Sequence, residues 1–73
     1  MAKYTKEAIA AVAKNACFYV TPDDRWLRMQ WCDEDAGKFC AADEDSGEDY
    51  IFKFEDMCEI DDPQFHEITR SVF

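Results

Sequence analysis

The sequence predicts an α+β fold in which an N-terminal helix packs on a three-stranded antiparallel β-meander. Three observations support this prediction: an alanine-rich segment with helical spacing of its apolar residues, three β-forming segments separated by turn-forming residues, and alternation of apolar and polar residues within those segments. The chain has 73 residues, so residues 1–73 are expected to form a single domain. Hydrophobic residues make up 48% of the chain and aromatic residues 15%, which is enough for a folded core.

The predicted helix begins at Lys6 and ends near Ala16. Thr5 is its candidate N-cap, because a threonine hydroxyl can accept a hydrogen bond from a free backbone N–H. The apolar residues expected to face the core recur at i, i+3, i+4 and i+7, and they are Ile9, Val12, Ala13 and Ala16. Residues 18–20 are expected to form a short extended segment that ends before Pro22.

Three strands are expected at Arg25–Asp33, Lys38–Ala42 and Asp49–Glu55, with turns at 35–37 and 43–48. The turn positions predict the cross-strand pairs, which include Cys32 with Cys40, Trp31 with Ala41, and Phe39 with Phe52. An apolar face then collects Leu27, Met29, Trp31, Phe39, Ala41, Tyr50, Phe52 and Phe54. A mixed face collects Trp26, Arg28, Gln30, Cys32, Cys40, Ile51 and Lys53.

The last segment has two interpretations. Asp62 followed by Pro63 is typical of a helix N-cap and first turn, and Phe65, Ile68 and Val72 would then share one helical face. The same segment is rich in β-forming residues, Thr69 among them. A short C-terminal helix is the favoured prediction.

No motif in the sequence indicates catalysis, a cofactor or a metal. Cys17, Cys32, Cys40 and Cys58 are spaced by 15, 8 and 18 residues, which fits no common zinc pattern, and they are interpreted as small core residues. His66 is the only histidine and is expected on the surface. The acidic run 43–49 does not fit an EF-hand loop in either register. A loop starting at Asp43 has Gly47 at position 5 and Phe54 at position 12, and one starting at Ala42 loses the first ligand and has Lys53 at position 12. We therefore predict that the protein is not an enzyme and has no cofactor and no metal.

The distribution of charge is the strongest functional signal. The net charge is −9, and residues 23–62 alone carry −11. This excess disfavours direct binding to nucleic acid or to an anionic membrane, and it favours basic partners. The candidate partner-binding carboxylates lie at the two expected turns and after the last strand, and they are Asp33, Glu34, Asp35, Asp43, Glu44, Asp45, Glu48, Asp49, Glu55 and Asp56.

Neither a membrane span nor a signal peptide is recognisable in the sequence. A cytoplasmic location is expected, in which the cysteines are reduced thiols. The sequence leaves open whether an oxidant joins Cys32 to Cys40, which are predicted to be cross-strand neighbours.

In size, charge and lack of catalytic motifs, the chain resembles small acidic phage-encoded anti-defence proteins of the anti-CRISPR or DNA-mimic type. The resemblance covers the whole chain and includes no diagnostic residue, so no residue role is carried over from that class. It implies an inhibitor that acts in the cytoplasm of a host cell by blocking the nucleic-acid site of a nuclease or surveillance complex.

Two functional hypotheses follow. In the first, the chain is a non-catalytic acidic protein that occupies a basic nucleic-acid-binding surface on its partner, as a DNA mimic does. In the second, it is a protein-interaction or structural module whose contact patch is the mixed sheet face, and its acidic surface serves solubility. The residues proposed for that patch are Trp26, Arg28, Gln30 and Ile51.

Overall fold

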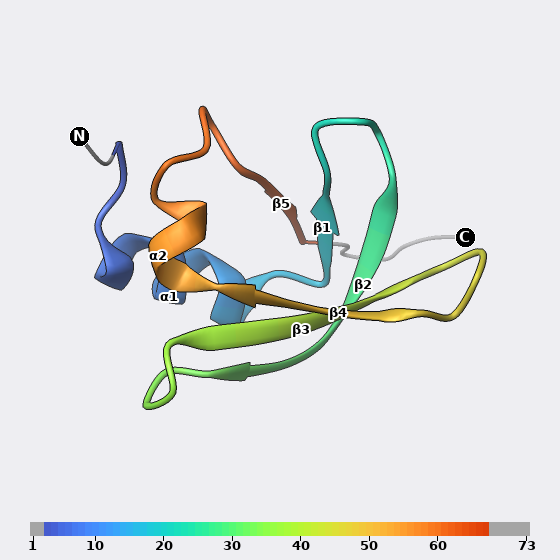
Figure 1. The fold of residues 1–73 in the computed structure, drawn as a ribbon, viewed down its shortest axis with the longest axis horizontal. Helices are drawn as coiled ribbons and strands as arrows, with labels where there is room; N and C mark the ends of the chain where they lie inside the picture. Colours follow the sequence, from blue (N-terminus) through green and yellow to red (C-terminus); the bar gives the residue numbers. More distant parts are fainter. Residues whose placement is uncertain (1–2, 68–73) are drawn as a thin grey trace.

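The computed structural model describes residues 3–67, which form two helices and a five-stranded antiparallel sheet. In chain order the elements are α1 (Lys6–Asn15), β1 (Phe18–Val20), β2 (Trp26–Asp33), β3 (Lys38–Asp43), β4 (Asp49–Lys53), α2 (Phe54–Met57) and β5 (Gln64–His66). The strands lie in the order β4-β3-β2-β1-β5, so β5 returns to the edge beside β1 (Figure 1). The predicted α+β class is confirmed, with five strands in place of three.

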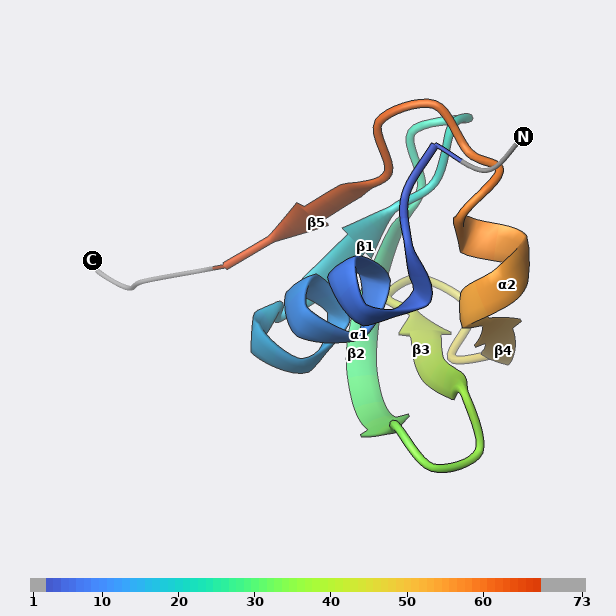
Figure 2. The same ribbon diagram turned by 90° about the vertical axis from the view of Figure 1, so that its left-hand side faces the viewer.

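Helix α1 begins and ends close to the predicted positions. The Thr5 hydroxyl accepts a hydrogen bond from the Ala8 backbone N–H at 3.1 Å, as expected of an N-cap. The buried face differs from the prediction, because it is formed by Ile9, Ala10 and Ala13, whereas the Val12 side chain is 45% exposed. Helix α2 packs beside α1 (Figure 2), and its first residue, Phe54, joins the same buried cluster as Ala10 of α1. This second helix was not anticipated from the sequence.

The β3–β4 hairpin has the predicted register. Phe39 lies opposite Phe52, and their rings stack with centroids 5.1 Å apart. The predicted strand through Glu55 is too long, because β4 ends at Lys53 and the chain turns into α2. The Phe54 backbone N–H donates to the Gly37 carbonyl at 2.9 Å, which holds the start of α2 against the β2–β3 turn. The Phe54 side chain remains buried, as the alternation predicted.

The predicted β2–β3 register is wrong by one residue near the turn. Trp31 lies opposite Cys40, and Cys32 lies opposite Phe39, because a bulge at Gln30 interrupts the pairing between Met29 and Trp31. A bulge adds one residue to one strand, so the side chains on its two sides no longer follow a single alternation. Trp31 therefore points outward and is 42% exposed, whereas Cys32 packs against the core.

The bulge also separates the two cysteines that were predicted to be neighbours. Cys32 packs against the core on one face of the sheet, and Cys40 lies in the cross-strand row of Trp31 and Ile51 on the other. All four cysteines are free thiols, and Cys17 is exposed rather than in the core. A direct disulfide between Cys32 and Cys40 would require the hairpin to change register.

The predicted C-terminal helix is wrong at residues 64–66, which form β5 and pair with β1. Asp62 adopts a left-handed conformation with φ of 51°, which is incompatible with the extended backbone of an N-cap residue. The chain instead turns back so that Phe65 lies opposite Tyr19, with ring centroids 5.2 Å apart. Ile68 and Val72 lie outside the described residues.

The core lies between the two helices and one face of the sheet, here called the inner face. Its largest fully buried side chains are Tyr19, Phe39, Ile9, Leu27 and Met57. The opposite surface, the outer face, is left open at Trp26, Trp31 and Ile51. None of the elements within residues 3–67 is long and apolar enough to be a membrane-spanning helix.

The inner and outer faces predict very different responses to truncation. Phe39→Ala should lower the free energy of unfolding by about 3–5 kcal/mol, because Phe39 is fully buried and the cavity left behind can close only in part. Ile51→Ala should cost less than about 0.5 kcal/mol, because this side chain is 58% exposed. Urea denaturation followed by tryptophan fluorescence measures both. Equal effects would contradict the assignment of the two faces.

Candidate partner-binding surfaces

The ten predicted carboxylates fall into two groups at opposite ends of β3 (Figure 1). The β2–β3 group is Asp33, Glu34 and Asp35, together with Glu55 and Asp56 of α2, which starts against the same turn. The β3–β4 group is Asp43, Glu44, Asp45, Glu48 and Asp49. The length of β3 separates the groups by roughly 17 Å, at about 3.4 Å per residue. The carboxylates therefore do not form one continuous patch.

Four of the ten carboxylates have partners within the molecule. Asp33 accepts a hydrogen bond from the Ala36 backbone N–H at 3.1 Å, which closes the β2–β3 turn. Glu34 pairs with Lys14 of α1 at 2.9 Å. Glu44 pairs with Arg28 of β2, also at 2.9 Å, and Asp43 is described below.

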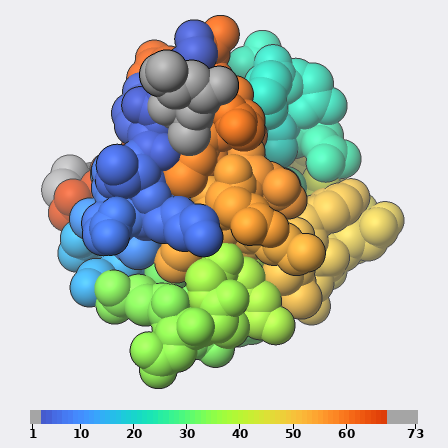
Figure 3. Space-filling model, turned by 60° about the vertical axis from the view of Figure 1, so that its left-hand side comes forward, coloured from blue at the N-terminus to red at the C-terminus, as the bar shows by residue number. Residues whose placement is uncertain are grey.

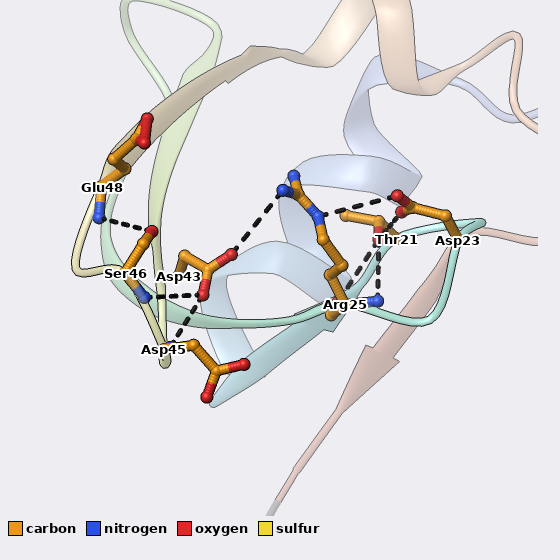
Figure 4. Close-up of polar contacts among 7 residues, drawn as sticks. All are labelled: Thr21, Asp23, Arg25, Asp43, Asp45, Ser46 and Glu48. Atoms are coloured by element: carbon orange, nitrogen blue, oxygen red, sulfur yellow. Dashed lines mark hydrogen bonds and ion pairs between the residues drawn. The ribbon is translucent and has the colours of Figure 1, made fainter.

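Asp43 builds the β3–β4 turn (Figure 4). One of its carboxylate oxygens accepts hydrogen bonds from the backbone N–H groups of Asp45, at 2.7 Å, and Ser46, at 3.2 Å. The other oxygen lies 3.7 Å from the Arg25 guanidinium. These hydrogen bonds, with a smaller contribution from Arg25, lower the pKa of the Asp43 carboxyl. The side chain is only 11% exposed, so we assign it a structural role.

Arg25 links the β3–β4 turn to the β1–β2 turn, a connection that was not anticipated from the sequence. Its guanidinium lies 3.7 Å from both Asp43 and Asp23 (Figure 4). It also lies 5.2 Å from the centre of the Tyr50 ring. The Arg25 backbone N–H donates to the Thr21 hydroxyl at 3.0 Å, and that hydroxyl also donates to Asp23. The Thr21 contact is the main reason that the pKa of Asp23 is lowered. Thr21 and Asp23, which are turn-forming residues just before Arg25, could have indicated this turn in the sequence.

The other six predicted carboxylates are exposed and have no ion pair or side-chain hydrogen bond with any residue between 3 and 67. We call them the unpaired carboxylates, and they are Asp35, Glu55 and Asp56 at one end of β3 and Asp45, Glu48 and Asp49 at the other. They lie on two hairpin turns and on a short helix held against one of those turns. The backbone positions from which these side chains extend are therefore held by hydrogen bonds within the two turns.

The outer face combines aromatic and basic side chains. The Arg28 guanidinium lies 5.0 Å from the centre of the Phe18 ring, Phe18 meets Trp26 edge to face at 5.6 Å, and Trp26 lies 5.1 Å from His66. The four residues of the predicted patch are all exposed, and the structure adds Trp31 to them. The bulge at Gln30 is what turned Trp31 outward, and the sequence carries no clear signal of it.

The cysteines and the histidine do not assemble into a site in the part of the chain that the structure describes. Within residues 3–67, no three His, Cys, Asp or Glu side chains are placed so as to hold a metal ion. Burial is the main cause of the raised pKa of both Cys32 and Cys40, and nearby carboxylates raise it further. The neutral thiol is therefore favoured, and neither cysteine has the activated character of a nucleophile.

Comparison of the chain with protein-family models, with curated proteins and with solved structures gives no match.

The role of Asp43 can be tested through pH. Asp43→Asn should lower the thermal unfolding midpoint at neutral pH, because a neutral amide makes no ion pair with Arg25 and its oxygen accepts weaker hydrogen bonds from the turn N–H groups than a carboxylate does. Since the folded-state pKa is lowered, the stabilisation is present above the unfolded value of about 3.9 and is lost as pH falls through the folded value. The midpoints of the two proteins should therefore converge as pH falls from 5 towards 2. Asp45→Asn, at an exposed neighbour, should match the wild type throughout. A constant gap for Asp43→Asn would contradict the assignment.

Proposed function

We propose that the chain is a non-catalytic acidic binding protein that occupies a basic nucleic-acid-binding surface on its partner, as DNA-mimic inhibitors of the anti-CRISPR type do. The observation that carries the proposal is the set of six unpaired carboxylates, held in two groups by the hairpins at the ends of β3. A partner that binds nucleic acid presents lysine and arginine clusters, and carboxylates can meet them through charge-assisted hydrogen bonds.

The geometry favours a two-point contact. The groups are roughly 17 Å apart, which is of the same order as the roughly 12 Å width of the DNA major groove that separates two rows of phosphates. The side chains of Asp33 and Asp43 hold the backbone of the two turns. Little conformational freedom would then be lost on docking, and this preorganisation would raise the affinity of the complex.

The outer face supports a second candidate function, that of a module binding its partner through apolar contacts. Trp26 and Trp31 are 45% and 42% exposed, and Ile51 is exposed still further. Tryptophan and arginine are enriched at the centres of protein interfaces, and Arg28 lies on the same face. Salt separates the two functions, because screening weakens contacts between exposed charges and leaves apolar contacts largely unchanged.

The first test uses a partner captured from the host and identified by mass spectrometry, with the complex then remade from purified proteins. Two triple variants remove the unpaired carboxylates at one end of β3 or the other: Asp45→Asn, Glu48→Gln, Asp49→Asn, and Asp35→Asn, Glu55→Gln, Asp56→Asn. Each should raise the Kd by at least about tenfold, because several charge-assisted contacts are lost. Stability should hold or increase as repulsion falls.

A charge-matched control is Glu7→Gln, Asp24→Asn, Glu67→Gln, which removes three exposed carboxylates outside both groups. This control should bind as the wild type does, and duplex DNA should compete with the protein for the partner. If both triple variants bind normally while Trp31→Ala does not, the mimic hypothesis is wrong and the outer face is the contact surface. Simultaneous binding of DNA and protein to the partner would contradict the mimic hypothesis as well.

A further inference from the structure

The basic residues fall into two groups, those that form ion pairs and those that do not. Seven lie in the described part of the chain, and four of them form ion pairs: Lys3, Lys14, Arg25 and Arg28. The other three, Lys6, Lys38 and Lys53, have no ion-pair partner among residues 3–67, although the chain carries 17 acidic residues. All three line the same surface pocket. The three lysines that form no ion pair with residues 3–67 are thus gathered around one pocket.

The pocket has a volume of about 370 Å³ and lies where α1, the β2–β3 turn and α2 meet. Figure 3 shows these three segments on one face, with the start of α1 in blue, the turn in green and α2 in orange. Besides the three lysines, it is lined by Gly37, Phe54 and Glu55. The pocket therefore draws its residues from parts of the chain that are far apart in the sequence.

Two of these lysines are placed unfavourably for the free protein. Lys38 and Lys53 lie directly opposite each other on β3 and β4, and like charges in that position destabilise a sheet. Lys38 has one aromatic neighbour, since its ammonium lies 6.0 Å from the centre of the Trp31 ring, which is a weak contact. A bound anion would remove the repulsion between the two lysines.

We propose that this pocket binds the phosphoryl group of a small phosphate ester. Lysine ammonium groups bind phosphate as point charges, whereas a planar carboxylate is matched best by arginine. Three ammonium groups can approach the oxygens of a tetrahedral dianion from different directions. The volume exceeds that of a bare phosphate and falls in the range of roughly 300–1,000 Å³ typical of small-molecule sites, so there is room for an organic part.

The acidic surface opposes this binding. Glu55 lines the pocket, Asp33 lies opposite Lys38 on β2, and Glu7, Glu34 and Asp35 line the adjoining surface. Glu34 is already paired with Lys14 at 2.9 Å. The β3–β4 group lies roughly 17 Å away, which is about two screening lengths at physiological salt. Direct contact of the three ammonium groups with the anion must therefore outweigh the repulsion from these neighbouring carboxylates.

The experiment is an NMR titration of the wild-type protein with glycerol phosphate and, separately, with inorganic phosphate, at ionic strength held constant with sodium chloride. We expect saturable shifts centred on residues 36–38 and 53–55, with tighter binding of the ester than of the bare ion. A Trp26→Phe variant leaves Trp31 as its one tryptophan, and its fluorescence should change with the same midpoint, because Lys38 lies beside that ring. Shifts that grow without saturation, or that spread over all the lysines, would overturn the proposal.

Lys38→Gln and Lys53→Gln should each weaken binding of the ester by at least about tenfold, since each removes a charge-assisted contact. Lys53→Gln should also raise the unfolding midpoint, and Lys38→Gln should leave it near the wild-type value because it loses the cross-strand neighbour Asp33 together with the repulsion from Lys53. These midpoints separate loss of the site from loss of the fold. Lys14→Gln is the matched control, because Lys14 is paired with Glu34 and does not line this pocket, and its affinity should equal that of the wild type. Equal affinities in all four proteins would contradict the site. None of these readouts depends on the partner-binding proposal.

Discussion

Burial of Tyr19 is the interaction on which the arrangement of the sheet depends. Its ring lies 5.2 Å from Phe65 of β5, 5.3 Å from Phe52 of β4 and 6.1 Å from Phe39 of β3, so one side chain joins both ends of the sheet to its centre. Strand β1 is three residues long, and pairing alone would stabilise so short a strand weakly. Burial, and to a lesser extent the charge of Asp23, raises the pKa of the Tyr19 phenol, because both disfavour the phenolate.

The parts of the fold that could be predicted from the sequence are those governed by local periodicity. Helix α1 and the β3–β4 hairpin follow from the spacing of apolar residues and from turn-forming residues, and both were found near their predicted positions. The bulge at Gln30 and strand β5 depend on contacts distant in the sequence, and both were missed. Phe65 fits a helical and an extended pattern equally well, and its packing against Tyr19 decides between them. Trp31 was placed on the wrong face for the same kind of reason, since one inserted residue changes the alternation.

The candidate surface was predictable in composition and not in the role of each carboxylate. The sequence placed the ten acids at the two turns or after the strand at 49–55. In the structure Asp33, Asp43 and Asp49 are the terminal residues of strands that flank the turns, and Glu55 and Asp56 lie in α2. It could not tell that Asp33 and Asp43 would shape the backbone of their turns, or that Lys14 and Arg28 would neutralise Glu34 and Glu44. These contacts join residues up to 20 positions apart. What remains for a partner is a smaller set than the net charge suggests, and it is divided between the two ends of β3.

The same strand connects the acidic and the basic features of the molecule. Lys38 begins β3 beside the lysine pocket, and Asp43 ends it at the β3–β4 turn. A phosphate held by Lys38 and Lys53 would add about two negative charges next to Asp35 and Glu55, at the end of β3 where cations now offset the carboxylates. That end would then present a more uniform negative field to a basic partner. Because linked binding is reciprocal, a partner that covers this end with its own cations would in turn strengthen phosphate binding. The lysine repulsion that weakens the free protein would thus become part of its recognition surface.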